Sequence, residues 1–308
     1  MLKLVVLTCN ARSYSSRRLC DVARKRGHVA KAYDTMRFSL LVDRDEPALF
    51  YDGERFDAPD AVVPRIGGSS MTFGLAVVRQ LEALGSLASN SAEAFAACRD
   101  KLYGAQRLAA RGLRVPRTAF ARKSDAIRPA VEQLGGAPVV VKLLEGTQGI
   151  GVVLAETTEA AEAVVQALHS ARQNVLIQRF VGESRGRDVR ALVVGGRVVA
   201  AMARTARGSE FRSNVHRGGV GERIELDPEF ERTAVQAAAI LGLDIAGVDL
   251  LESRDGPLVL EVNASPGLEG IEKTTGLDVA SAVIDHVERR AAAREHRIEP
   301  SARPTASA

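Results

Sequence analysis

The sequence contains no tryptophan, only three cysteines and no long run of apolar residues. The odd number of cysteines (Cys9, Cys20 and Cys98), which have no metal-binding spacing, argues against a disulfide framework and indicates reduced thiols in a cytoplasmic protein. No apolar run reaches the ~18 residues that a transmembrane helix needs. The apolar start of the chain is also too short for the core of a signal peptide. We therefore expect a cytoplasmic protein without a membrane partner.

Two common nucleotide-binding fingerprints are also missing. The first predicted strand, 3–8, is not followed by GxGxxG, which argues against a dinucleotide-binding domain of that type. The glycine-rich stretch 142–152 lacks the Lys-Ser/Thr pair of a Walker A loop, and a strand rather than a helix is predicted after it. Neither fingerprint therefore predicts a nucleotide site in this chain.

The composition is that of a soluble globular protein. The chain has 308 residues, of which 46% are hydrophobic and 26% are charged, and its net charge is +4. Arginines are nevertheless concentrated in the middle of the chain: Arg179, Arg185, Arg187, Arg190, Arg204, Arg207, Arg212 and Arg217. This basic density favours an acidic substrate or phosphates, although a solvated face or a nucleic-acid patch would have the same composition. The segment has few aromatic residues for stacking on bases, so we expect no direct nucleic-acid recognition.

Strand-like and helix-like segments alternate over the first part of the chain. Strands are predicted at 3–8, 29–33 and 61–66, and helices at 13–26 and 71–84. This alternation predicts an α/β domain with a parallel sheet.

The pattern changes further along. One helix is predicted over 91–111, and the block after it has the size of a small α+β lid. From Val175 the strands are predicted to be mostly antiparallel, and Gly195-Gly196 is a strong hairpin signal. We predict an α/β and α+β protein with four parts: 1–92, 93–176, 177–290 and a disordered tail, 291–308, which ends in the polar stretch EPSARPTASA.

Three oxygen-bearing side chains lie in two apolar segments near the end of the chain. Glu261 and Asn263 stand two residues apart in LVLEVNASPG, so on a strand they point to the same face. Asp249 lies in the preceding GVDLLE, and the turn-prone SRDGP between the two segments predicts a β-hairpin. Carboxylate and amide oxygens suit Mg²⁺, which usually bridges to substrate phosphates. A surface hairpin with scattered polar residues is the alternative.

The register of this hairpin decides whether a metal site is possible. A strict two-residue turn at Asp255-Gly256 would pair Asp249 with Val262 and direct Asp249 to the wrong face. A shared ion therefore requires an odd-length loop or a β-bulge, and we predict one of them.

A second candidate site is the segment KLLEGTQGIGV, 142–152. Its glycines, Gly146, Gly149 and Gly151, can turn backbone N–H groups toward an anion. Lys142 ends the preceding strand, where its ammonium group could reach nucleotide phosphates. An ordinary glycine-rich hairpin with an exposed lysine is the alternative.

A third candidate is EFRSNVHRGG, 210–219. Arg212 has a fixed charge and can bind phosphate or carboxylate in a bidentate manner, and Asn214 offers both donors and an acceptor. Upstream, Asp188 could accept a hydrogen bond from a ribose hydroxyl or could simply cap its strand.

Taken together, these segments resemble an ATP-grasp enzyme with an N-terminal pre-ATP-grasp domain, and more closely the RimK family. The resemblance covers about residues 1 to 288. It is carried by PRIG (64–67), RDKL (99–102), EGTQGIGV (145–152), FRSNVHRGG (211–219), DIAGVDLL (244–251) and EVNASPGLEGIEKTTG (261–276). That family contains α-L-glutamate ligases that add glutamate to the C-terminus of the sixth small-subunit ribosomal protein.

The resemblance implies roles for individual residues. Asp249, Glu261 and Asn263 would hold two metal ions, with Glu261 bridging, and Arg212 would be the catalytic residue that stabilises an oxyanion. The nucleotide-binding residues would be Lys101, Lys142, Gly146, Gly149, Gly151, Gln178, Arg179, Phe180, Val181, Asp188, Arg212, Ser213 and Asn214. Arg65 and Arg204 would bind substrate. The chain departs from the expected pattern beside Arg204, where Ala203 and Thr205 replace charged residues.

The resemblance also implies a function. The chain would use ATP and two Mg²⁺ or Mn²⁺ ions to join L-glutamate, through an acyl phosphate, to the acidic C-terminal tail of the ribosomal protein, with poly-α-glutamate as an extended product. A homotetramer is implied by the same resemblance. One alternative is a related amide ligase for a small acidic metabolite or a carrier protein in lysine or pterin-type cofactor biosynthesis. Another is a catalytically silent nucleotide- or nucleic-acid-binding protein.

Overall fold

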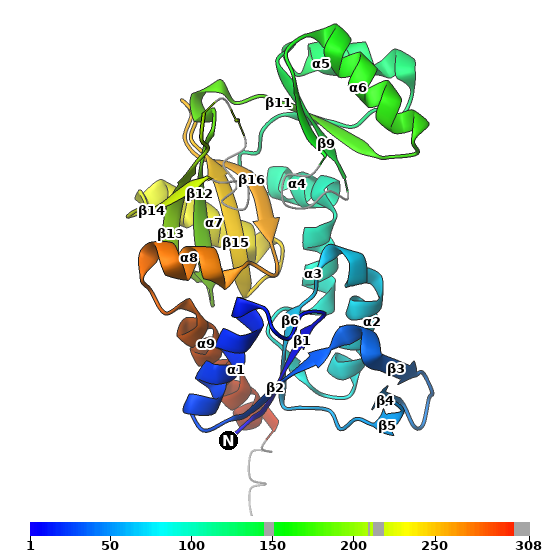
Figure 1. The fold of residues 1–308 in the computed structure, drawn as a ribbon, viewed down its shortest axis with the longest axis vertical. Helices are drawn as coiled ribbons and strands as arrows, with labels where there is room; N and C mark the ends of the chain where they lie inside the picture. Colours follow the sequence, from blue (N-terminus) through cyan, green and yellow to red (C-terminus); the bar gives the residue numbers. More distant parts are fainter. Residues whose placement is uncertain (145–150, 209, 212–218, 299–308) are drawn as a thin grey trace, which may run out of the picture. The chain divides into compact units, whose positions relative to one another are not determined.

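The computed structural model describes the chain except for residues 145–150, 209, 212–218 and 299–308. It divides into two compact units (Figure 1). The first unit consists of Met1–Ala92 together with Asp278–Ala308, and the second is Glu93–Leu277. Within the described residues, no helix is both long and apolar enough to cross a membrane.

The first unit is built on a parallel sheet of order β2-β1-β6-β7, as the alternation of strands and helices predicted. Its strands are β1 (Lys3–Thr8), β2 (Val29–Asp34), β6 (Ala61–Arg65) and β7 (Leu87–Ala88). The helices of this unit are α1 (Tyr14–Lys25), α2 (Met71–Ala83) and α9 (Val279–Ile298), with short 3-10 turns η1 (Thr35–Arg37) and η2 (Gly68–Ser70). Apolar strands such as β1, whose last five residues are buried, form the core of the sheet.

The C-terminal helix is longer than the predicted tail boundary allows. Helix α9 continues to Ile298 and so includes the first part of 291–308, because its apolar stripe remains buried as far as Ala291. Helix α9 packs on α1, and Arg26 forms ion pairs with Glu288 and Asp285. Residues 299–308 lie outside the described part of the chain.

A small antiparallel sheet in the first unit was not predicted. Its strands are β3 (Phe38–Leu41), β4 (Ala48–Tyr51) and β5 (Glu54–Arg55). Edge-to-face contacts among the rings of Tyr33, Phe38, Tyr51 and Phe56 hold it together, with centroids about 5 Å apart. These strands are too short to give a clear alternation in the sequence.

The second unit begins with two helices where one was predicted over 91–111. Helix α3 (Ala92–Arg99) and helix α4 (Lys101–Ala110) are separated at Asp100. Asp100 has an extended backbone, and its carboxylate caps α4 by accepting a hydrogen bond from the backbone N–H of Tyr103. This break matters for the site because it starts α4 at Lys101.

An antiparallel sheet of order β10-β9-β11-β8, with two helices packed on it, forms the part that we call the lid, 118–179. The strands are β8 (Thr118–Ala119), β9 (Val139–Leu143), β10 (Val152–Ala155) and β11 (Val175–Arg179). The helices are α5 (Ile127–Gln133), preceded by the 3-10 turn η3 (Ser124–Ala126), and α6 (Thr158–Ser170). Fully buried apolar side chains, including Ile127, Val141 and Val165, fill the space between helices and sheet.

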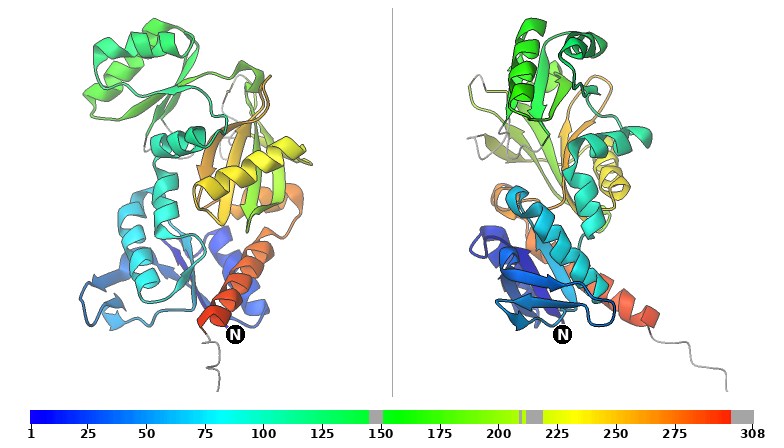
Figure 2. Two further views of the ribbon diagram at one scale, coloured as in Figure 1. Left: turned by 180° about the vertical axis from the view of Figure 1, so that it is seen from behind. Right: turned by 90° about the vertical axis from the view of Figure 1, so that its right-hand side faces the viewer.

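The rest of the second unit is an antiparallel sheet of order β14-β13-β12-β15-β16, which we call the site sheet. Its strands are β12 (Arg187–Val194), β13 (Arg197–Thr205), β14 (Val220–Arg223), β15 (Ile245–Leu251) and β16 (Leu258–Asn263), and η4 (Gly182–Ser184) leads into β12. Helix α7 (Pro228–Ile240) packs against β12, β15 and β16, whereas α8 (Leu268–Thr275) packs against β13 and β14 (Figures 1 and 2). The predicted antiparallel pattern after Val175 is confirmed.

Candidate functional site

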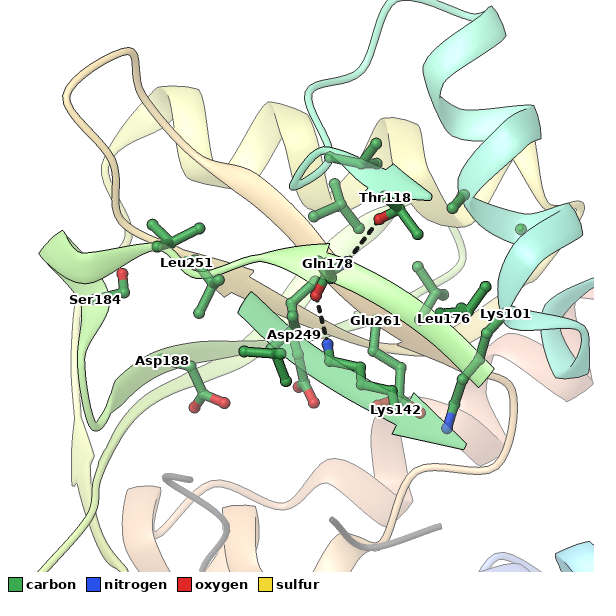
Figure 3. Close-up of a pocket in the computed structure, with 18 of the residues that line it drawn as sticks. Lys101, Thr118, Lys142, Leu176, Gln178, Ser184, Asp188, Asp249, Leu251 and Glu261 are labelled. Atoms are coloured by element: carbon green, nitrogen blue, oxygen red, sulfur yellow. Dashed lines mark hydrogen bonds between the residues drawn. The ribbon is translucent and has the colours of Figure 1, made fainter. Parts of the chain in front are cut away.

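A pocket in the second unit is lined by residues of the lid, of helix α4 and of the site sheet (Figure 3). Helix α4 contributes Lys101, and the lid contributes Lys142 and Gln178. The site sheet contributes Asp249 and Glu261 together with other residues. Strands that are far apart in sequence therefore place cationic and acidic side chains around one space.

The charged floor of this pocket follows from strand register. Arg190 of β12 lies opposite Asp249 of β15, and Asp249 lies opposite Glu261 of β16. Side chains at directly opposite positions of neighbouring strands project from the same face. One row across the sheet therefore carries an arginine and two carboxylates.

The predicted irregularity in the β15–β16 hairpin is confirmed. Leu250 pairs with Val259, but Asp249 pairs with Glu261, so Leu260 is the additional residue of a bulge in β16. Without this bulge, Asp249 would lie opposite Leu260 and Glu261 would point to the other face. The loop 252–257 has an even length, so the bulge alone brings the two carboxylates together.

Two arginines hold the carboxylate of Asp249. Arg190 donates from Nε to Oδ1 at 2.7 Å and from Nη2 to Oδ2 at 2.6 Å, and Arg204 Nη2 lies 3.0 Å from Oδ2. Burial of Asp249 opposes its ionisation, but the charges of Arg190 and Arg204 outweigh burial, so the pKa of Asp249 lies below its ordinary value. The carboxylate is therefore ionised, and both of its oxygens accept hydrogen bonds from arginine.

Arg204 links Asp249 to a second carboxylate, that of Asp188. The guanidinium donates to Asp188 through two nitrogens, with Nε 2.6 Å from Oδ1, because Asp188 and Arg204 are opposite each other on β12 and β13. Both side chains are almost completely buried, at 5% and 3% exposure. Burial disfavours the charge of Arg204, but Asp249 and Asp188 outweigh burial and raise its pKa.

On the lid side, Lys142 belongs to a chain of hydrogen bonds (Figure 3). Its Nζ donates to Gln178 Oε1 at 2.6 Å, and Gln178 Nε2 donates to Thr118 Oγ1 at 3.0 Å. The Thr118 hydroxyl donates to the backbone oxygen of Pro116 at 2.8 Å. Burial lowers the pKa of Lys142 to about 8, although Glu261 and Asp249 favour its charged form.

Lys101 enters the same pocket from the first turn of α4. Burial lowers its pKa, and the nearby Glu261 partly opposes the decrease. Glu261 itself is exposed at the pocket surface. Both lysines thus interact with the same carboxylate, which places them beside the predicted metal ligands.

The segment 178–181, which was predicted to bind nucleotide, connects the lid to the site sheet. Gln178 is buried, and Arg179, Phe180 and Val181 also line the pocket. The ring of Phe180 lies 6.4 Å from that of Phe211, with an interplanar angle of 77°. This end of the pocket is accordingly more apolar than the charged floor.

The remaining residues that were predicted to form the site lie at separate places in the chain. Asn263 ends β16 and lies opposite Gly247, on the face that carries Asp249 and Glu261. Gly151 is described and has a positive φ of 72°, where a Cβ would overlap the Leu143 side chain. Arg65 ends β6 of the first unit, whereas the pocket belongs to the second. The predictions for Gly146, Gly149, Arg212, Ser213 and Asn214 concern positions outside the described residues.

Sequence reasoning did not identify Thr118 or the role of Arg190. Arg190 follows Asp188 by two positions, which places both on one face of a strand, and this spacing was a usable signal. No local pattern marks Thr118, because its partner Gln178 lies on a different strand.

The oxygen atoms of Asp249, Glu261 and Asn263 are the kind of ligand that a hard divalent cation prefers, and the three residues lie on the same face of the sheet. Both acids and the amide project from one side of adjacent strands, as the register shows. In the described part of the chain, no group of three or more His, Cys, Asp or Glu side chains could hold an ion by itself. The candidate set thus consists of two carboxylates and one amide on one face.

The family comparison agrees with this geometry. Residues 98–287 match the model of the RimK-like ATP-grasp domain, and residues 2–95 match that of the RimK pre-ATP-grasp domain. The chain belongs to the RimK-like ATP-grasp family. A protein of Rhodopirellula baltica named probable alpha-L-glutamate ligase is 51% identical over 286 residues, covering 93% of this chain and 71% of that protein. A Marinomonas protein of the same name is 48% identical over 290 residues, covering 94% and 96%.

Solved structures show the same fold. The ATP-grasp ligase PsnB, complexed with a minimal precursor, has a TM-score of 0.74 at 24% identity and covers 94% of this chain and 99% of its own. A RimK domain protein from Sphaerobacter thermophilus has a TM-score of 0.69 at 24% identity and covers 92% and 98%. Further PsnB structures contain a precursor peptide with AMPPNP, or a minimal precursor with Mg and ADP. The chain thus has the ATP-grasp fold with an N-terminal pre-ATP-grasp domain.

Proposed function

We propose that this RimK-family protein is an ATP-dependent α-L-glutamate ligase that acts on a carboxylate at the C-terminus of a peptide or protein. The observation that supports it most is the arrangement of Lys101 and Lys142 beside the Asp249–Glu261 pair in one pocket. This arrangement provides cations for phosphate oxygens next to carboxylates for a metal. The names of the relatives, which match nearly the whole chain, supply glutamate as the amine substrate.

The reaction needs an activated carboxylate because a free carboxylate is a poor acyl donor. One carboxylate oxygen of the acceptor attacks the γ-phosphorus of ATP and displaces ADP, which yields an acyl phosphate. Lys101 and Lys142 bind the phosphate oxygens, and the segment 178–181 holds the base. When bound by Asp249, Glu261 and Asn263, divalent cations would neutralise charge on the phosphates.

The second step forms the amide bond. The amino group of L-glutamate attacks the acyl carbon, phosphate leaves, and the amine loses a proton to solvent. No protein nucleophile is required for this sequence. Arg212, which lies outside the described residues, is proposed to stabilise the developing oxyanion.

We further propose that the acceptor has an acidic tail, with the sixth small-subunit ribosomal protein as the first one to test. The arginines of the middle segment support an anionic partner. Arg179 and Arg185 of this segment are exposed, and their positive charge favours an anionic chain. Mg²⁺ or Mn²⁺ as two ions, a substrate contact from Arg65 and a homotetramer are parts of the same proposal. The predicted substrate contact from Arg204 is not part of it, because its guanidinium is buried and paired with Asp188 and Asp249.

The test is mass spectrometry of the ribosomal protein after incubation with enzyme, ATP, Mg²⁺ and L-glutamate. We expect a ladder of glutamyl-sized additions on the intact acceptor. Controls are an acceptor without its acidic tail, a reaction without ATP, and the Glu261→Gln variant. None of these should give additions.

Other outcomes separate the alternatives. Glutamate addition to a small acid or a carrier protein, but not to the ribosomal protein, would keep the ligase chemistry and reject the acceptor. ATP binding without any product in a panel of carboxylate acceptors would reject the ligase proposal and favour a silent nucleotide-binding protein. Nucleic-acid affinity that falls steeply with salt would indicate a different function.

A further inference from the structure

The Asp249 carboxylate, a predicted metal ligand, is already occupied by guanidinium groups. Arg190 binds both of its oxygens in a fork, and Arg204 adds a second contact to Oδ2. A carboxylate accepts about four hydrogen bonds in total. Oδ2 therefore has no free lone pair, and the remaining position on Oδ1 lies next to the Arg190 guanidinium.

The charges around this carboxylate also oppose a free cation. Among the described side chains that line the pocket, with Arg190 beside them, the carboxylates are Asp188, Asp249 and Glu261. The cations are Lys101, Lys142, Arg179, Arg187, Arg190 and Arg204. Positive groups are thus in excess of negative ones before any substrate binds. A divalent ion that entered alone would meet net repulsion at short range.

Arg190 differs from Arg204 in how firmly it is fixed. Arg204 binds two carboxylates and is only 3% exposed, so it is locked between β12 and β15. Arg190 forms an ion pair with Asp249, and its side chain is 19% exposed. The Arg190 side chain can therefore move away from Asp249 at a smaller cost than that of Arg204.

We propose that Arg190 is a positioning residue. It binds the Asp249 carboxylate while no metal is present, and it keeps divalent cations from binding to Asp249 until nucleotide phosphates are bound. The triphosphate supplies the negative charge and the oxygen ligands that the protein lacks. Cation binding and release of the Arg190–Asp249 contact then occur together. This inference rests on the proposed function, because it assumes that the pocket binds ATP with a metal.

Mn²⁺ binding followed by electron paramagnetic resonance tests this role without measuring turnover. We expect the wild-type protein to bind Mn²⁺ weakly when it is alone and tightly with AMPPNP. In Arg190→Gln, the affinity for Mn²⁺ without nucleotide should increase at least about tenfold, because one repelling charge is gone and both Asp249 oxygens become accessible. Arg190→Lys, which keeps the charge but not the fork, should give a smaller increase.

Arg128→Gln is the matched control. Arg128 also forms ion pairs with two carboxylates, Glu159 and Glu162, but it lies on α5 of the lid and does not line the pocket. Its Mn²⁺ affinity should equal that of the wild type. Circular dichroism of each variant checks folding, and if Arg190→Gln does not fold, the comparison of Arg190→Lys with the wild type decides.

Two results would overturn the inference. One is equal Mn²⁺ affinity of the wild type with and without AMPPNP, and the other is unchanged nucleotide-free affinity after Arg190 is replaced. Absence of Mn²⁺ binding by every protein, even with AMPPNP, would instead contradict the proposed metal site itself. The failure of the inference and the failure of the proposed function are therefore distinguishable.

Discussion

Asp249 and Glu261 lie directly opposite each other on β15 and β16, and a single bulge residue, Leu260, makes this pairing possible. The two carboxylates project from the same face, but their surroundings differ. Asp249 is buried between arginines, whereas Glu261 is exposed in the pocket. The buried carboxylate has a structural partner already, so the exposed one is the more accessible ligand for a cation.

Glu261→Gln should therefore remove most ligase activity with little effect on folding. We expect a decrease of at least ~100-fold in kcat, the usual size for loss of a key electrostatic group in a transition state. The measurement is glutamyl transfer by mass spectrometry alongside thermal unfolding. Glu222→Gln, at an exposed position of β14, is the control. Near wild-type activity of a folded Glu261→Gln protein would reject the metal-ligand role.

Lys142 should make nucleotide affinity depend on pH. Its pKa is about 8, so the ammonium group is lost as the pH rises from 7 to 9, and the phosphates lose a cationic partner. We expect affinity for an ATP analogue to fall about tenfold over this range. In Lys142→Arg the charge persists and the affinity should change little. If the affinity of the wild type and that of Lys142→Arg depend on pH in the same way, a group other than Lys142 titrates.

The same pKa has a consequence for stability without nucleotide. The unfolded chain keeps the Lys142 proton up to the ordinary pKa of a lysine, whereas the folded protein loses it near pH 8. The unfolded state then binds more protons, so the contribution of Lys142 to the free energy of unfolding rises as the pH increases above about 8. Denaturant unfolding of wild type and Lys142→Met at pH 7 and pH 9.5 measures it. If the free energy of unfolding rises more between pH 7 and pH 9.5 in Lys142→Met than in the wild type, the expected direction of the Lys142 contribution is wrong.

Thr118 should affect ATP binding through Gln178. Because the Thr118 hydroxyl donates its proton to Pro116, its oxygen can only accept from Gln178, which fixes Nε2 toward Thr118 and Oε1 toward Lys142. Thr118→Val would leave Nε2 without its acceptor, at a cost of about 1 kcal/mol. We expect KM for ATP to rise roughly fivefold with kcat nearly unchanged. Thr118→Ser should restore KM, and failure of this rescue would argue for a packing effect.

Breaking the Asp188–Arg204 pair should destabilise the second unit. Both groups are almost fully buried, so Asp188→Asn would leave Arg204 with less compensation for its charge, a loss of about 3 kcal/mol in the free energy of unfolding. The double variant Asp188→Leu/Arg204→Met should be less destabilised than Asp188→Asn. Chemical denaturation of this double variant and of the single variants Asp188→Leu and Arg204→Met measures the coupling. A loss in the double variant equal to the sum of the two single losses would show that the residues do not interact.

The sequence predicted most regular elements because they have clear endings and patterns. Gly195-Gly196 joins β12 and β13, as its turn chemistry indicates, and the helices predicted over 13–26 and 71–84 correspond to α1 and α2. The break at Asp100 was missed, since a cap residue inside a helical pattern is not distinguishable from a surface aspartate. The β3–β5 sheet was missed because its strands are short and its aromatic contacts are between strands.

For the site, the sequence by itself determined the chemical types and their faces. Glu261 and Asn263 lie two residues apart in an apolar run, so on a strand they had to share a face. A two-residue turn would have directed Asp249 to the opposite face, so the sequence showed that a shift in register was required. Only the tertiary structure decided that a bulge supplies the shift and that Arg190 and Arg204 hold Asp249. The reason is physical: local spacing fixes which way a side chain points, whereas partners on different strands are fixed by the pairing of the whole sheet.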